Sequence, residues 1–242
     1  MKATLRPLLL SVLIFFSSCD QLPGIIDSLP TGQNGELDAI TMGNGLRQAL
    51  DFGVDKEVSK LAQKDGFFKN PLTKILLPEE LQKVDNALRS IGLDNAADEG
   101  LKLLNRAAEE AVAEALPIFV DAIKGITFND AKNILLGDQD AATQFLQTRT
   151  QQALYNKFSP IINDKLGSVG ATQIWSELIT RYNQIPFTND VTTDLTAYVT
   201  DQALSGVFKS IAVEELDIRS RVSSRTTTLL QQVFGYADRV KG

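Results

Sequence analysis

Two adjacent acids near the end of the chain have the surroundings that most favour chemistry. Glu214 and Glu215 lie in IAVEELDIR, where apolar residues occupy several sides of a predicted helix. Because an α-helix turns by about 100° per residue, both carboxylates cannot easily avoid the core side. A partly buried carboxylate in a cleft has a raised pKa and could act as a general acid or base. Arg219, one turn beyond Glu215, supports the interpretation that we favour, a structural ion pair between the C-terminal helices.

A second group of polar residues interrupts the apolar stripe of the long helix predicted from about residue 95. An inward Arg106 requires a carboxylate, with Asp121 or Glu215 as the candidate partners. Glu215 together with Asp121 or Glu214 also forms a carboxylate-enzyme hypothesis, which requires these groups to meet in one cleft. The candidate ligand-binding residues are therefore Arg106, Asp121, Glu214, Glu215 and Arg219. We predict no catalytic set and no metal site.

Other acids have structural explanations. Asp138 and Asp140 could ligate Ca²⁺, but the further acids that an EF-hand loop needs are missing from the residues that follow. We predict instead that Asp138 or Asp140 caps the next helix. Glu109, Glu110 and Glu114 are predicted to form a solvated helix face rather than a metal site.

Composition excludes several functions. The chain contains no histidine and a single cysteine, Cys19. Without histidine, the Ser–His and Cys–His nucleophile pairs and imidazole metal ligation are excluded. The formal net charge is −6, and an acidic surface repels phosphate backbones and anionic headgroups, so nucleic acid is not an expected partner. No glycine-rich phosphate loop follows a predicted strand, and we predict no cofactor.

The first 18 residues have the layout of a secretory signal. Two basic residues precede the apolar run 8–16, which is too short to span a bilayer. The following FSSC resembles the lipobox of bacterial lipoproteins, in which the cysteine sulfur receives a diacylglycerol, the preceding peptide is cut and the new amine is acylated. Phe16 departs from that pattern, since leucine is preferred there. The alternative is a plain signal peptide with an incidental Cys19.

Residues 19–36 are predicted to be a lipidated tether, because they contain two prolines, three glycines and no sustained period. As a flexible coil the tether reaches roughly 20–25 Å. Membrane contact is expected through the lipid on Cys19, and the protein is expected in the bacterial cell envelope, facing the periplasm. Asp20 resembles the residue that retains enteric lipoproteins on the inner membrane, but that rule does not extend to every phylum. The inner and outer membranes therefore both stay open.

Helical periodicity covers residues 37–235, and the tail 236–242 is predicted to be loose. The pattern predicts about seven to nine helices in a single bundle-like domain. One helix is expected over 78–91, and Phe67 and Phe68 of the intervening loop are expected to plug the core. Residues 191–199 alternate like a strand. However, Leu195, Val199, Ala203, Val207 and Ile211 step by four, and this longer pattern predicts a helix.

Several motifs between residues 45 and 235 resemble a family of bacterial exported proteins built on one uncharacterised helical domain. They include DGFFKNP, LPEELQKVDNALRSIG, LNRAAEEA, PIFVDAIKGIT, DAATQF and RTTTLLQQVFG. The resemblance implies an all-α domain and no known chemistry. We therefore expect a lipid-anchored binding or assembly module that contacts an envelope protein. The alternative is a carrier of an apolar ligand in a cavity between helices bent at Pro117 and Pro160.

Overall fold

The computed structural model describes residues 37–77, 94–184 and 194–242, together with positions 82, 89, 90, 92, 186 and 192. These residues form helices and no sheet, which confirms the predicted all-α class. The helices are α1 (Ala39–Leu61), α3 (Asp94–Val112), α4 (Leu116–Lys124), α5 (Phe128–Leu135), α6 (Ala141–Gly167), α7 (Ala171–Tyr182), α8 (Leu195–Ser220), the 3₁₀ helix η2 (Val222–Ser224) and α9 (Thr228–Lys241). The helix predicted over 78–91 lies outside the described residues, apart from three isolated positions.

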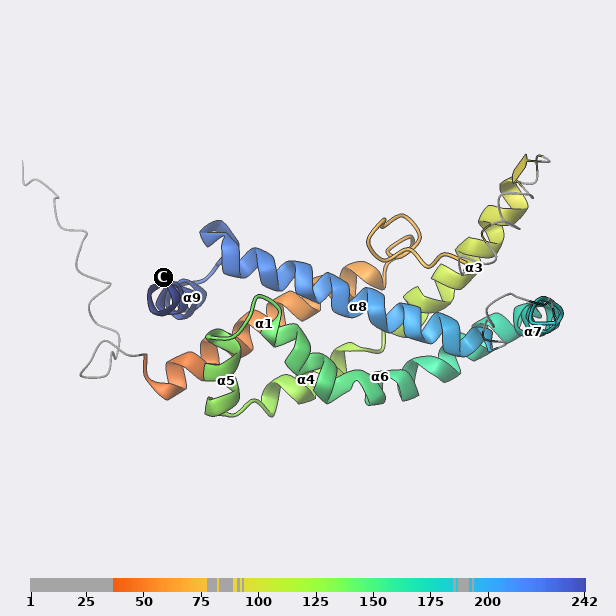
Figure 1. Ribbon diagram of the computed structural model, residues 1–242. Helices are drawn as coiled ribbons and strands as arrows, with labels where there is room; N and C mark the ends of the chain where they lie inside the picture. Colours follow the sequence, from red (N-terminus) through yellow and green to blue (C-terminus); the bar gives the residue numbers. More distant parts are fainter. Residues whose placement is uncertain are drawn as a thin grey trace, which may run out of the picture.

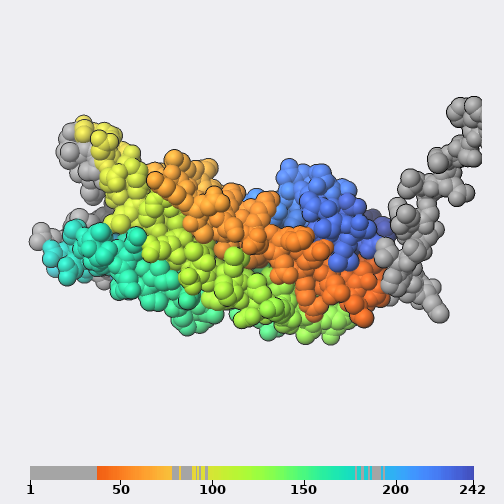
Figure 2. Space-filling model, turned by 180° about the vertical axis from the view of Figure 1, so that it is seen from behind, coloured from red at the N-terminus to blue at the C-terminus, as the bar shows by residue number. Residues whose placement is uncertain are grey.

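The body is elongated, and α1, α6 and α8 run along its length (Figure 1). Helix α9 crosses the end at which α1 begins, while α3 and α7 reach towards the opposite end (Figures 1 and 2). Helices α6 and α8 are antiparallel neighbours. Glu215 near the end of α8 contacts the start of α6, and Thr196 at the start of α8 donates to Asn163 near the end of α6, at 3.3 Å.

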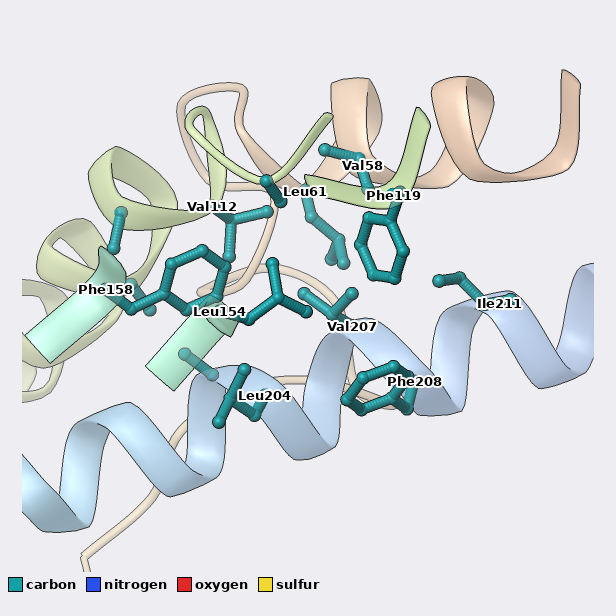
Figure 3. Close-up of a cluster of buried hydrophobic side chains, with 14 of the residues drawn as sticks. Val58, Leu61, Val112, Phe119, Leu154, Phe158, Leu204, Val207, Phe208 and Ile211 are labelled. Atoms are coloured by element: carbon teal, nitrogen blue, oxygen red, sulfur yellow. The ribbon is translucent and has the colours of Figure 1, made fainter. Parts of the chain in front are cut away.

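Most of the stripes predicted from periodicity face one main core, and the α9 stripe belongs to a second, smaller cluster. All five α8 residues of the four-residue pattern are buried. The segment 195–199 is helical rather than a strand. Asp194 caps the start of this helix by accepting a hydrogen bond from the Ala197 amide at 2.9 Å. In the middle of the body, Leu154 and Phe158 of α6 pack near Val207 and Phe208 of α8 (Figure 3). Burial of these stripes is what positions α6 beside α8.

The loop after α1 closes one side of the core. Phe67 is fully buried, which confirms that it plugs the core. A Cβ at Gly206 of α8 would lie 2.7 Å from the Phe67 ring, so the glycine gives the ring its space. Phe68 is only half-buried, and the Nζ atom of Lys74 lies 4.4 Å from its ring centroid.

The two short helices begin where their first residues predict. Pro117 occupies the first turn of α4, where its missing N–H costs no hydrogen bond. Thr127 and Asp130 form the predicted capping box of α5, with the Thr127 amide 3.0 Å from the Asp130 carboxylate. Pro160 lies inside α6, and the helix continues past it to Gly167.

The prediction of a loose tail over residues 236–242 is wrong. Helix α9 continues through Gly235 to Lys241, and Tyr236 and Ala237 are buried in a small cluster with Met42 of α1. The sequence suggested an end at Gly235 because glycine commonly caps helices. Tertiary packing outweighs that preference here, since the last turns of α9 cover the start of α1.

Exchanging Gly45 for alanine is expected to destabilise the domain by about 1–3 kcal/mol. A Cβ at this position would lie 2.2 Å from Cγ2 of Val233, so α1 and α9 would have to separate. Gly235→Ala is the matched control, because its Cβ meets nothing within 4 Å and its φ is not positive. Helix propensity should make this second variant more stable by about 0.5–1 kcal/mol. Thermal unfolding measures both, and a harmless Gly45→Ala would contradict the close helix crossing.

Candidate functional site

Glu215 forms the ion pair with Arg219 that we favoured, but the pair lies within α8 and holds α6 and α5 rather than joining the C-terminal helices. Its side chain is buried and accepts hydrogen bonds from the backbone amides of Ala142 and Thr143, at 2.9 and 2.8 Å, and from the Thr143 hydroxyl. Arg219 donates to the same carboxylate through Nε and Nη2, at 2.9 and 2.7 Å. A carboxylate has about four lone-pair sites, so these five bonds leave no acceptor capacity for a substrate proton.

Arg219 extends this network to a second helix end. Its Nη1 and Nη2 atoms donate to the carbonyls of Leu135 and Ile134, at 3.1 and 2.8 Å. Glu215 therefore caps the start of α6 and Arg219 caps the end of α5, although neither lies near those helices in sequence. Asp140, which we expected to cap α6, makes no side-chain bond to the backbone of its first turn.

Glu214 and Glu215 border one small cavity, together with Arg219 and apolar residues of α1, α8 and α9. Its volume is about 20 Å³, room for a single water molecule. Glu214 forms an ion pair with Lys56 at 2.5 Å. Asp121 is exposed on α4 and does not line the cavity. These carboxylates therefore do not surround a substrate-sized space, and this cavity is too small for an apolar ligand.

Arg106 forms the expected ion pair, but with different partners. Its guanidinium contacts Asp65 in the loop after α1 and Glu109 one turn along α3. Neither Asp121 nor Glu215 takes part. The carboxylate of Asp65 has a lowered pKa, chiefly because of the hydrogen bond from Lys69 and then that from Arg106. Because the folded pKa lies below the unfolded one, this group stabilises the fold above its unfolded pKa and loses that effect as the pH falls through the folded pKa.

The predicted solvated face of α3 is wrong for Glu109. Its side chain is buried and accepts hydrogen bonds from the amides of Phe67 and Phe68, at 3.1 and 3.4 Å, beside the contact with Arg106. Glu110 and Glu114 do lie on the surface, where they pair with lysines of α6. Glu109 thus fixes the loop that carries the core plug.

Two further buried polar groups have the same structural role. Asn105 holds the backbone of Ile75 through an amide pair of 2.8 and 2.9 Å. Arg225, which sequence reasoning missed, donates to the carbonyls of Ile218 and Arg219 at the end of α8, at 3.0 and 2.7 Å. Arg225 follows a serine pair outside any periodic stripe, so no pattern marked it as buried.

Two open features of the described surface are a hollow of about 520 Å³ over the loop after α1, lined by polar and charged residues, and the α6/α8 groove, which also exposes apolar residues. The groove consists of two shallow, wide-open hollows of about 460 and 630 Å³ that share Ala212. Helix α6 contributes Thr143, Gln147 and Gln151, and the residues before it contribute Asp138, Gln139 and Asp140. Helix α8 contributes Asp201, Ser205, Lys209, Ala212, Val213 and Leu216, above Leu204 and Phe208.

The groove is chemically unlike the interior. Val213 and Leu216 are 54% and 42% exposed, although their place beside Glu214 suggested core positions. Asp138, Asp140 and Asp201 are exposed and make no ion pair with the residues that the structure describes. Within the described ranges no three acidic side chains gather as metal ligands, and this includes Asp138 and Asp140. The groove therefore presents exposed apolar side chains next to exposed carboxylates.

Sequence reasoning missed the groove because its two walls are some 60 residues apart in the chain. The one available signal was the apolar character of IAVEELDIR on several sides, which indicates an exposed apolar face as readily as a buried one.

Cys19 and the predicted tether lie outside the described residues. None of the described helices combines the length and the apolar character that crossing a bilayer requires.

The fold and these contacts define an all-α single domain whose buried charges cap its own helices and loops. A family model described as "Protein of unknown function (DUF4197)" matches residues 36–235, and the chain belongs to this family. No match was found among curated proteins or among solved structures.

Proposed function

We propose that this protein is a lipid-anchored component of the bacterial cell envelope whose helical domain binds another envelope protein. The anchor rests on FSSC at residues 16–19 and on the tether-like composition of residues 19–36. Two or more acyl chains hold a protein stably on a membrane, whereas one chain is marginal. The first described residues lead into α1 at the end where α9 lies, so the tether would hold that end towards the membrane (Figure 1).

The observation that carries the binding role is the α6/α8 groove. Its exposed apolar residues and its carboxylates without an ion pair contrast with the interior, where Glu109, Glu215 and Arg225 all form ion pairs. Large exposed apolar patches rimmed by polar groups mark interaction sites, and the groove has this combination on a small scale. An elongated body held by one end would keep a groove along its side accessible to a partner.

Cys19→Ala is expected to abolish incorporation of labelled fatty acid and to release the protein from the membrane fraction. The reason is that the sulfur and the new amine at this residue carry every acyl chain of the proposed anchor. Metabolic labelling followed by fractionation measures both effects. The domain should stay folded by circular dichroism in either form. Equal labelling of the two proteins, or unchanged fractionation of the variant, would contradict the anchor.

A further inference from the structure

The chemistry of the α6/α8 groove identifies the kind of partner. We propose that it binds a basic amphipathic helix of another envelope protein. This inference rests on the proposed binding role and adds the partner's shape and charge. Three properties of the groove lead to it: the secondary structure of its walls, its charge, and the position of its apolar residues.

The walls of the groove favour a helical partner over an extended one. The walls are α8 on one side and α6 with the turn 138–140 before it on the other, and the two helices pair their own backbone groups internally. An extended peptide would find no free edge to pair with, whereas a helix satisfies its own backbone. From Asp201 to Leu216 the α8 wall is about 22 Å long, which matches roughly four turns of a partner helix.

The charge of the groove favours a basic partner. Asp138 and Asp140 lie at one end and Asp201 lies towards the other, while Lys209 is the single cation among the lining residues. The three carboxylates make no ion pair within the described part of the chain. Lysine or arginine side chains near both ends of the partner would supply the missing charges. The same carboxylates repel anionic headgroups and phosphates, which disfavours a lipid surface as the occupant.

The apolar residues favour an amphipathic partner. Val213 and Leu216 are three residues apart on α8 and half or nearly half exposed, beside the small Ala212. Apolar side chains spaced by three and four residues on a partner helix would cover them and be removed from water. The partner thus carries an apolar stripe flanked by basic residues.

Site-specific photo-cross-linking of the full chain in living cells tests this assignment. A cross-linking amino acid at Val213 is expected to capture a protein segment of about 15 residues that combines such a stripe with lysine or arginine. Joint Asp138→Lys and Asp140→Lys substitution should lower the cross-linking yield about tenfold, because the new lysines repel the basic side chains of the partner that the carboxylates attract. Asp201→Lys, far from the start of α6, should lower it severalfold and provides a second variant if the first folds poorly.

The matched control is joint Asp55→Lys and Asp121→Lys substitution, which changes the net charge equally on exposed positions outside the groove. Its yield should stay within about twofold of the unsubstituted protein. Capture of a second copy of this chain, of an acidic segment or of a segment without helical periodicity would overturn the assignment. So would a yield that falls equally in the control. Capture of an acidic or non-helical segment of another protein leaves the binding role standing, whereas capture of a second copy alone, or of no protein, removes both.

Discussion

Glu215→Ala is expected to lower the free energy of unfolding by about 3–5 kcal/mol, the cost of leaving one member of a buried ion pair alone. The substitution strips Arg219 of its carboxylate and frees the amides of Ala142 and Thr143 at the start of α6. For a domain of this size the midpoint of thermal unfolding should fall by roughly 6–20 °C. Thermal and urea unfolding measure the change.

Glu214→Ala is the matched control for this prediction. Glu214 is the neighbouring acid, but its partner Lys56 is 58% exposed, and such pairs contribute at most about 1 kcal/mol. In addition, Glu215→Ala combined with Arg219→Ala should lose less stability than the two single variants added together. If the Glu214 variant were the less stable of the two neighbours, the inward direction assigned to Glu215 would be wrong.

Glu109→Ala is expected to destabilise the domain by a similar amount, about 3–5 kcal/mol. It leaves Arg106 with one carboxylate fewer and frees the amides of Phe67 and Phe68, which hold the core plug in place. Amide hydrogen exchange at these two residues should accelerate more than exchange in α8. The exchange pattern distinguishes local loss of the loop from uniform loss of stability.

Glu110→Ala is the control, since Glu110 and its partner Lys165 are 52% and 42% exposed. Its stability should change by less than about 1 kcal/mol. The comparison distinguishes two interpretations of these neighbouring acids: Glu109 buried and Glu110 exposed, or both exposed. If both acids lay on a solvated face, as the sequence pattern predicts, the two variants would behave alike.

The fold was predictable because its core follows local periodicity. The residues that step by four along α8 are all buried, and the capping box of α5 forms between residues three apart. Such patterns depend on neighbours in the chain, so one sequence reveals them. The end of α9 was mispredicted because the burial of Tyr236 depends on α1, almost 200 residues earlier.

The polar interior was predictable only in part. Glu215 and Arg219 are one turn apart on a helix, so their pairing was readable from spacing. Arg106 was correctly expected to need a carboxylate, but its partner Asp65 comes from a loop some 40 residues away, and nothing local selects it over Asp121. Glu109 was assigned to solvent for the same reason. The groove as a whole could not be predicted from the sequence, because its two walls meet only when α8 packs on α6.

One measurement separates the structural network from the proposed binding surface most directly. The photo-cross-linker at Val213 is combined either with the Asp138→Lys and Asp140→Lys pair or with Glu215→Gln, at a temperature where both proteins remain folded. We predict that the groove variant loses the captured partner while its unfolding midpoint changes little, and that the Glu215 variant keeps the partner despite a much lower midpoint. The opposite result, a partner lost with Glu215→Gln and retained with the reversed groove charges, would contradict the account.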